Sequence, residues 1–373
     1  YDIPHVLIDG YDVVTNKPRT AAYRAPGAPM AAFACETLVD ELAVELGIDP
    51  IEFRRKNAAR EGTRRADGAR HLRIGFLEML EAMQAHPHYS APLLDENSGR
   101  GIATGFWRNN TGPSSAVAHV MADGSISLLE GSVDIGGTRT AIAQQFAEVM
   151  GIATEDVHPR VVDTDSIGYT SVTGGSGVTF KTGLAAYEAA WDVIHQLKER
   201  AALLWETESS QVEYVSGSLY HKCDDTLQIS FKDLAAKLNE LGGPIVGRAS
   251  VNPRGVGASF SAMIVDVNVD PETGKVQILR CTAFQDAGIA IHPAYVEGQI
   301  QGGSVQGIGW ALNEGYVMSS EGNLLNASLL DYRMPTSLDV PMIDAVIIEV
   351  PNPGHPFGVR GIGEASIVPP LAA

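Results

Sequence analysis

Residues 131–138 (GSVDIGGT) have the composition of a loop that binds an anion, because they leave a predicted strand and enter a predicted helix. Glycines let backbone N–H groups approach an anion closely, and a helix N-terminus adds a partial positive charge. The segment matches neither GxxxxGK[ST] nor GxGxxG. It therefore suits a phosphate or a pyrophosphate, although a tight strand-to-helix turn without a ligand explains the same residues.

Residues 173–179 (TGGSGVT) form a second glycine-rich loop, again at the start of a long predicted helix. The same reasoning predicts an anion cradle here. A flexible glycine loop capped by Thr179 is the alternative. Two such loops in one acidic chain favour a single polyanionic cofactor over two unrelated turns.

Two further loops carry one charged side chain each among small residues. In residues 358–364 (GVRGIGE), glycines would let Glu364 project into a cavity, where burial could make its carboxylate a general base. The alternative is a carboxylate that stabilises a helix N-terminus. In residues 20–29 (TAAYRAPGAP), Arg24 could hold an anion or a carbonyl oxygen, or it could be a solvated arginine in a rigid turn.

Composition excludes several classes of function. The net charge is −18, which argues against binding to nucleic acid or to an anionic membrane surface. No apolar run approaches the length of a membrane span, and we expect a cytoplasmic protein. The chain has neither HExxH nor CxxC nor GxSxG, so we expect no metal held by protein ligands and no hydrolase elbow. The three cysteines are predicted to be buried, reduced thiols.

The elements that must position these loops follow from hydrophobic periodicity and turn residues. The patterns predict an α+β fold with mixed or antiparallel sheets and packed helices. A linker at 86–99 suggests a boundary between residues 1–99 and 100–373. The predicted helices cover residues 29–47, 50–56, 75–85, 139–151, 180–206, 231–241 and 293–317. The predicted strands lie at about 101–109, 116–122, 125–135, 157–164, 259–270, 275–288 and 340–350.

Five segments, taken in order, resemble the large molybdenum-binding subunit of the xanthine dehydrogenase/aldehyde oxidase family of molybdenum hydroxylases. The segments are AYRAPGAPMAAFACETLVDELA, GSVDIGGTRTAIAQQFAEVMGI, TGGSGVTFKTGLAAYEAA, QDAGIAIHPAYVEGQIQGGSVQGIGWALNEG and NPGHPFGVRGIGEASIVPP. The resemblance implies the molybdopterin-binding fold of that family. Residues 1–99 would then be the first part of the molybdopterin-binding region, with the Arg24 loop. Residues 100–373 would be the second part, with the cofactor loops and Glu364.

The resemblance also implies roles for individual residues. Glu364 would be the catalytic base and Arg24 the catalytic arginine on the substrate side of molybdenum. The metal would be held by the pterin dithiolene, with no ligand from the chain, and the cofactor would be molybdopterin, as its cytosine dinucleotide. The residues that match the family's cofactor-binding positions are Gly136, Gly137, Thr138, Gly175, Ser176, Gly177, Val178, Thr179 and Gln299.

The family's reaction implies partners as well. A molybdenum hydroxylase oxidises an aldehyde or an N-heteroaromatic carbon with water as the oxygen source. Its electrons pass to [2Fe–2S] and FAD centres, which we expect on partner chains. The chain resembles the carboxy-terminal portion of the subunit, so the amino-terminal half is expected as a separate chain or fragment. Ala25 occupies the position where carbon monoxide dehydrogenases of this family carry a copper-binding cysteine, which favours hydroxylation. A non-catalytic molybdopterin-binding or scaffold subunit is the alternative.

Overall fold

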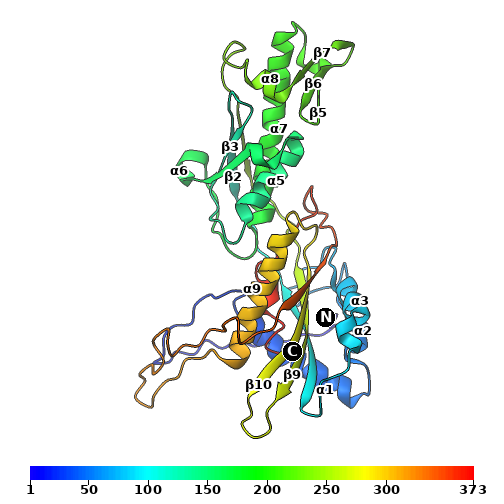
Figure 1. The fold of residues 1–373 in the computed structure, drawn as a ribbon, viewed down its shortest axis with the longest axis vertical. Coiled ribbons are helices and arrows are strands. Elements are labelled where there is room, and N and C mark those ends of the chain that lie inside the picture. The colour runs from blue at the N-terminus through cyan, green and yellow to red at the C-terminus, as the bar shows by residue number, and fades with distance from the viewer. The chain divides into compact units, whose positions relative to one another are not determined.

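The computed structural model describes residues 1–373, which divide into two compact units (Figure 1). The first unit comprises residues 1–109, 257–353 and 360–373, and the second comprises residues 110–256 and 354–359. The sequence suggested a boundary at residues 99–100, which fall inside strand β1 (Ser98–Trp107). The structure groups this strand with residues far along the chain, because β1 forms an antiparallel ladder with β9 (Ser259–Val269).

A four-stranded sheet in the order β1-β9-β10-β11 forms the centre of the first unit. β9 and β10 (Val276–Asp286) are antiparallel, with a register shift between Ile278 and Arg280. β11 (Ile343–Ile348) pairs with β10 in parallel. The helices of this unit are α1 (Ala28–Glu45), α2 (Pro50–Lys56), α3 (Phe76–Ala85), α4 (Pro87–Ser90) and α9 (Pro293–Leu312), with the 3-10 turn η3 at Ala365–Ile367.

Alternation along β9 divides the core of this unit into two layers. Phe260, Ala262 and Ile264 pack with residues of α2 and α3 on one face of the sheet. Met263 and Val265 pack with α9 on the other face. Because successive side chains of a strand point to opposite faces, one apolar strand serves both cores. Each fully buried large aliphatic or aromatic side chain contributes about 1.5–3 kcal/mol.

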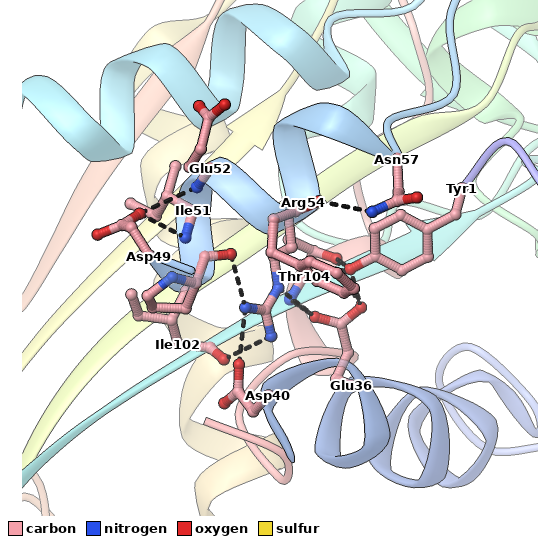
Figure 2. Close-up of polar contacts among 12 residues, drawn as sticks. Tyr1, Glu36, Asp40, Asp49, Ile51, Glu52, Arg54, Asn57, Ile102 and Thr104 are labelled. Atoms are coloured by element: carbon pink, nitrogen blue, oxygen red, sulfur yellow. Dashed lines mark hydrogen bonds and ion pairs between the residues drawn. The ribbon is translucent and has the colours of Figure 1, made fainter. Parts of the chain in front are cut away.

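A buried ion-pair network fastens α1 to α2 and β1 (Figure 2). Arg54 is fully buried, and its Nε lies 2.9 Å from Glu36 Oε2 while its Nη1 lies 2.7 Å from Asp40 Oδ1. Glu36 also accepts hydrogen bonds from the Thr104 amide at 2.7 Å and the Tyr1 hydroxyl at 2.5 Å. A buried charge needs such pairing, because removing one partner costs about 3–5 kcal/mol. The network thereby fixes the helix that begins just after the Arg24 loop.

The second unit is built on a four-stranded sheet in the order β4-β3-β2-β8. β2 pairs antiparallel with both β3 and β8, whereas β3 and β4 are parallel. The apolar faces of α5 and α7 complete a single core with this sheet, including Phe146, Val193 and Leu128. The elements are β2 (Ser114–Val120), β3 (Ile126–Glu130), α5 (Thr138–Met150), β4 (Val157–Val161), α6 (Thr164–Ile167), α7 (Val178–Leu204) and β8 (Val246–Val251), with the 3-10 turn η1 at Thr154–Asp156.

A smaller antiparallel sheet, β5-β6-β7, follows α7 in the second unit. Leu219 of β6, Phe231 and Leu234 of α8 join the same core as the larger sheet. The elements are β5 (Val212–Val215), β6 (Ser218–His221), β7 (Asp224–Ser230) and α8 (Phe231–Ala235), with the 3-10 turn η2 at Ser209–Gln211.

The α+β class with mixed and antiparallel sheets is confirmed, and each helix and strand predicted above has a counterpart. Some predicted details are wrong. The helix predicted over 293–317 ends at Leu312, and the linker predicted at 86–99 contains α4. Cys281 is buried in β10, but Cys35 on α1 and Cys223 in the turn between β6 and β7 are exposed. None of the helices combines the length and apolar character needed to cross a bilayer.

Candidate functional site

Three residues predicted for the site converge in the first unit. Arg24 precedes α1, Gln299 lies on α9 and Glu364 directly precedes η3. Arg24 Nη2 donates to Gln299 Oε1 at 2.9 Å and to the Gln299 carbonyl at 3.2 Å, and Arg24 Nε donates to the Gly363 carbonyl. The Ala25 amide donates to Glu364 Oε1 at 3.3 Å. The structure thus brings the predicted acid and the predicted arginine to one loop junction.

The Arg24 loop is itself rigidly shaped. Ala25 is fully buried and has a φ of 54°, a left-handed conformation that costs an alanine about 1–2 kcal/mol. The guanidinium of Arg24 also donates from Nη1 to Gln306 Oε1 at 2.8 Å. Burial lowers the pKa of Arg24, and the nearby Glu364 carboxylate opposes that shift. The guanidinium therefore stays charged and is held at a fixed place beside Glu364.

Side chains from distant elements bind successive carbonyl groups of the segment that carries Glu364. Asn109 Nδ2 donates to Gly361 at 2.9 Å, Gln285 Nε2 donates to Ile362 at 2.7 Å, and Ser261 Oγ donates to Ala365 at 2.6 Å. Arg24 donates to the Gly363 carbonyl, so carbonyl groups along this irregular backbone have hydrogen-bond donors. The sequence analysis did not find these three supporting side chains.

One signal for these residues was present in the sequence. Gln285 and Ser261 are polar residues at buried positions, each next to apolar residues of its strand. A polar side chain in a strand core needs a hydrogen-bonding partner, so each such interruption indicates a specific contact. The identity of the partner could not be read from the strand itself.

A buried ion pair anchors the same segment at its start. Arg360 Nε lies 3.2 Å from Asp286 Oδ2, and both side chains are fully buried. The Asp286 carboxylate also accepts hydrogen bonds from the amides of Gly75, at 2.8 Å, and Gly288, at 3.0 Å. Burial raises the pKa of Asp286, and the Arg360 guanidinium opposes that shift. The pair ties the tail of the chain to the end of β10.

The two glycine-rich loops lie side by side in the second unit. The Val133 amide of the first loop donates to Thr173 Oγ1 of the second at 2.9 Å. Thr138 begins α5 and Val178 begins α7, so both loops open helices as predicted. The first loop uses left-handed backbone at Gly136 (φ 99°) and Gly137 (φ 91°), which explains the glycines there.

A carboxylate side chain of the first loop, that of Asp134, binds backbone amides of this loop. Asp134 Oδ1 accepts hydrogen bonds from the amides of Gly137 and Thr138, both at 2.9 Å. Asp134 Oδ2 lies 3.0 Å from Arg139 Nε, and these contacts lower the pKa of Asp134 against the effect of burial. Two of the amides predicted to cradle a phosphate are therefore engaged by a carboxylate.

The second loop is shaped by close approach to the chain after β1. A Cβ atom at Gly175 would lie 2.4 Å from Asn110 Cβ, and one at Gly177 would lie 2.3 Å from the Asn110 carbonyl oxygen. Gly177 is the N-cap residue of α7 and makes no side-chain hydrogen bond to the start of the helix. Val178 and Thr179 form the first turn of the helix. The second loop thus leads directly into the N-terminus of a long helix.

A buried acid beneath the first loop was also missed by the sequence analysis. Glu130 ends β3 and is fully buried, and its Oε2 accepts a hydrogen bond from the Ser132 amide at 2.5 Å. Its Oε1 has no hydrogen-bond partner. Burial raises the pKa of Glu130 to about 7, and the charge of Asp134 acts in the same direction.

Comparison with known proteins gives the class of the chain. Residues 79–341 match one family model described as a molybdopterin cofactor-binding domain, and residues 1–58 match a second model of that description. The chain therefore belongs to the molybdopterin cofactor-binding domain family, as the resemblance indicated.

Individual proteins of known name are similar to this chain along most of its length. The chain is 31% identical over 382 residues to the putative xanthine dehydrogenase molybdenum-binding subunit XdhA of Escherichia coli (strain K12), covering 96% of this chain and 50% of the relative. It is 30% identical to the gamma subunit of the 6-hydroxypseudooxynicotine dehydrogenase complex of Paenarthrobacter nicotinovorans, covering 100% of this chain and 50% of the relative. The chain thus spans about half the length of these curated relatives.

Solved structures agree on the fold. The quinoline 2-oxidoreductase of Pseudomonas putida 86 matches with a TM-score of 0.81 at 24% identity, over 94% of this chain and 49% of that one. The aldehyde oxidoreductase of Desulfovibrio gigas matches with a TM-score of 0.74 at 26% identity, over 94% of this chain and 38% of that one. The two units correspond to folds already known from molybdenum enzymes.

Proposed function

We propose that the chain is a component of a molybdenum hydroxylase that oxidises an aldehyde or an N-heteroaromatic carbon, with water as the oxygen source. The observation that carries this proposal is the meeting of Arg24 and Glu364. A carboxylate and a guanidinium occupy one half-buried loop junction, and the side chains of Asn109, Gln285 and Ser261 hold the backbone of the segment that carries Glu364. Such support is typical of a catalytic group that must keep its orientation.

In this proposal, Glu364 is a general base and Arg24 binds the substrate. A Glu364 carboxylate oxygen takes a proton from the water-derived oxygen nucleophile as that oxygen attacks the carbon. The Arg24 guanidinium orients a carbonyl oxygen or ring nitrogen of the substrate and stabilises negative charge that develops there. Hydrogen bonds from the guanidinium to Gln299, Gln306 and Gly363 hold Arg24 in this position.

The cofactor is proposed to be molybdopterin, as its cytosine dinucleotide. The residues proposed to hold it are Gly136, Gly137, Thr138, Gly175, Ser176, Gly177, Val178, Thr179 and Gln299. The Gly175–Thr179 loop supports this assignment, since its helix start has the backbone donors that a phosphate needs. At Gly137 and Thr138, a phosphate would have to displace Asp134. When bound, the molybdenum centre supplies the two-electron oxidation.

The substrate class is supported by what the relatives are named for. They include a nicotine 6-hydroxylase large subunit of Paenarthrobacter nicotinovorans and an aldehyde oxidoreductase of Megalodesulfovibrio gigas. These names cover azaarene and aldehyde carbons, and both are electron-poor positions open to attack by an oxygen nucleophile. A carbon monoxide dehydrogenase large chain is also among the relatives. Ala25 has no thiol, which favours the hydroxylase assignment for this chain.

Partner chains complete the proposal. The remaining half of the molybdenum subunit, a [2Fe–2S] subunit and an FAD subunit would act with this chain in the cytoplasm. Support comes from apolar side chains left in contact with water in the first unit. Leu7 is 86% exposed, Val14 97%, Leu330 86% and Leu338 95%. Large apolar side chains exposed to this extent are what a surface covered by another chain would present.

A non-catalytic molybdopterin-binding or scaffold subunit is the second candidate. It is favoured by the Asp134 carboxylate, which occupies two amides that the family resemblance assigns to the cofactor. A subunit whose Gly137 and Thr138 amides are bound by Asp134 could associate with partner chains without catalysing a reaction.

Measurements on the natural complex, purified with its partner chains, distinguish the hydroxylase component from the non-catalytic subunit. Molybdenum and pterin phosphate are measured first, then turnover of a panel of aldehydes and azaarenes with an artificial electron acceptor. Glu364→Gln should lower turnover by about 10²–10⁴-fold with unchanged molybdenum content, because the base is lost and the cradle is kept. Glu272→Gln, at an exposed turn residue, is the control and should behave as wild type. Full turnover of Glu364→Gln would remove the base role, and a complex without molybdenum or turnover would favour the scaffold.

A further inference from the structure

Five polar side chains are buried beneath the two glycine-rich loops of the second unit. They are at most 2% exposed, although each could hydrogen-bond to water at the surface. The residues are Ser114, Glu130, Ser132, Lys181 and Thr182. Burying polar groups costs free energy unless they bind one another, and an apolar core would stabilise the unit more simply. This cluster therefore indicates a need for a fixed backbone geometry in the loops above it.

Lys181 is the basic member of the cluster and holds the two residues that lead into the second loop. From α7, its Nζ donates to the Ser171 carbonyl at 3.1 Å, to Ser171 Oγ at 2.6 Å and to the Val172 carbonyl at 2.9 Å. The three protons of the ammonium group thus have three acceptors. None of these three acceptors carries a full negative charge, and burial lowers the pKa of Lys181, so the ammonium form depends on these three hydrogen bonds.

Hydrogen bonds connect the second loop to the first loop. Thr173 follows the two residues that Lys181 binds, and its Oγ1 accepts the Val133 amide of the first loop at 2.9 Å. Next to Lys181, Thr182 Oγ1 lies 2.6 Å from Ser132 Oγ and 2.9 Å from Ser114 Oγ. Two consecutive residues of α7 therefore connect residues 132–133 with residues 171–173.

We infer that Lys181 is a positioning residue that fixes the two glycine-rich loops at one spacing, so that both can contact a single phosphorylated ligand. The inference rests on the proposed function only for the identity of that ligand. The mechanical part, that Lys181 holds the first loop through Thr173, is a property of the chain itself. The positive charge of Lys181 adds attraction for an anion bound at the loops.

Amide hydrogen exchange of the full chain, read by mass spectrometry, tests the mechanical part without any ligand. Lys181→Met keeps the side chain's length and removes its charge and three hydrogen bonds. We expect exchange to accelerate at least about tenfold in peptides covering 170–177 and also in those covering 131–138, which Lys181 does not touch. Lys198→Met, at a half-buried lysine farther along α7, is the matched control and should change neither peptide.

Thr173→Val is the second variant, because it removes only the bond between the loops and leaves the buried cluster in place. It should accelerate amide hydrogen exchange in residues 131–138. If Lys181→Met fails to fold, Thr173→Val alone tests the inference. Unchanged exchange of residues 131–138 in Thr173→Val, or in a folded Lys181→Met, would overturn the inference.

Binding of inorganic pyrophosphate, measured by calorimetry, tests the ligand part. We expect Lys181→Met to weaken pyrophosphate binding at least about tenfold and Lys198→Met to leave it unchanged. Equal affinity of wild type and Lys181→Met would overturn the electrostatic role of Lys181. If wild type binds no pyrophosphate while the exchange results hold, the coupling of the loops stands and the assignment of the loops to a phosphorylated cofactor fails.

Discussion

Gly303 of α9 and Ser366 of η3 approach so closely that no larger residue fits at position 303. A Cβ atom there would lie 2.0 Å from Ser366 Oγ and 3.3 Å from the Arg24 guanidinium carbon. Ser366 Oγ in turn donates to the Gln299 carbonyl at 3.2 Å, one turn earlier on the helix. The absence of one side chain therefore sets the distance between α9 and the segment that carries Glu364.

Gly303→Ala should consequently damage the candidate site more than it damages folding. The added methyl group must push Ser366, and with it Glu364, away from α9. In the natural complex we expect turnover to fall by at least about tenfold, since small misplacements of catalytic groups have large effects on rate. Steady-state kinetics and thermal unfolding measure the two consequences.

Gly302→Ala provides a matched control on the same helix. A Cβ atom at Gly302 meets nothing within 4 Å. Alanine in a helix interior is about 0.5–1 kcal/mol more favourable than glycine, so this variant should unfold at an equal or higher temperature with normal turnover. If both variants keep wild-type turnover, the close approach of α9 does not matter to the site.

The contribution of Glu130 to the stability of the second unit should fall as the pH rises through the range where Glu130 titrates. The pKa of Glu130 is raised to about 7, largely by burial, from an unfolded-state value near 4.5. Between these values the folded chain binds more protons than the unfolded chain, so the free energy of unfolding decreases with pH and levels off above the folded-state pKa. The contribution of this group is at most about 3 kcal/mol.

Glu130→Gln should remove that pH dependence. The amide keeps an oxygen for the Ser132 amide and carries no charge to bury. Urea unfolding at pH 5.5, 6.5 and 8 should show the variant gaining stability over wild type as the pH rises. A wild-type curve that is flat or rises over this range, with the variant parallel to it, would contradict the prediction.

Asp134 should stabilise α5 and compete with an incoming anion. Asp134→Ala removes the acceptor of the Gly137 and Thr138 amides, and loss of such a cap costs about 1 kcal/mol. The same change frees both amides, so pyrophosphate should bind the variant more tightly than wild type. Chemical unfolding and calorimetric titration measure the two effects, which have opposite signs.

Asp134→Asn separates the cap from the charge. Its amide oxygen can still accept the two N–H groups, so stability should stay close to wild type while anion repulsion is lost. If pyrophosphate affinity is the same in wild type, Asp134→Ala and Asp134→Asn, then the first loop does not bind the anion.

The sequence by itself determined the elements and the chemical character of their loops. Helix and strand periodicities predicted the α+β class, because burial of an apolar face depends on spacing that is visible locally. The glycine-rich segments were predicted to lie at the starts of helices, and both do, before α5 and α7. The five family-like segments led to the molybdopterin-binding family, which the comparisons show.

Only the tertiary structure decided which residues support one another. Ser261, Gln285 and Asn109 bind the backbone of residues 361–365 from positions more than 75 residues away in the chain, for example Gln285 and Ile362 with a separation of 77. Hydrogen bonds of this kind depend on strand register and on helix packing, and no local pattern encodes them.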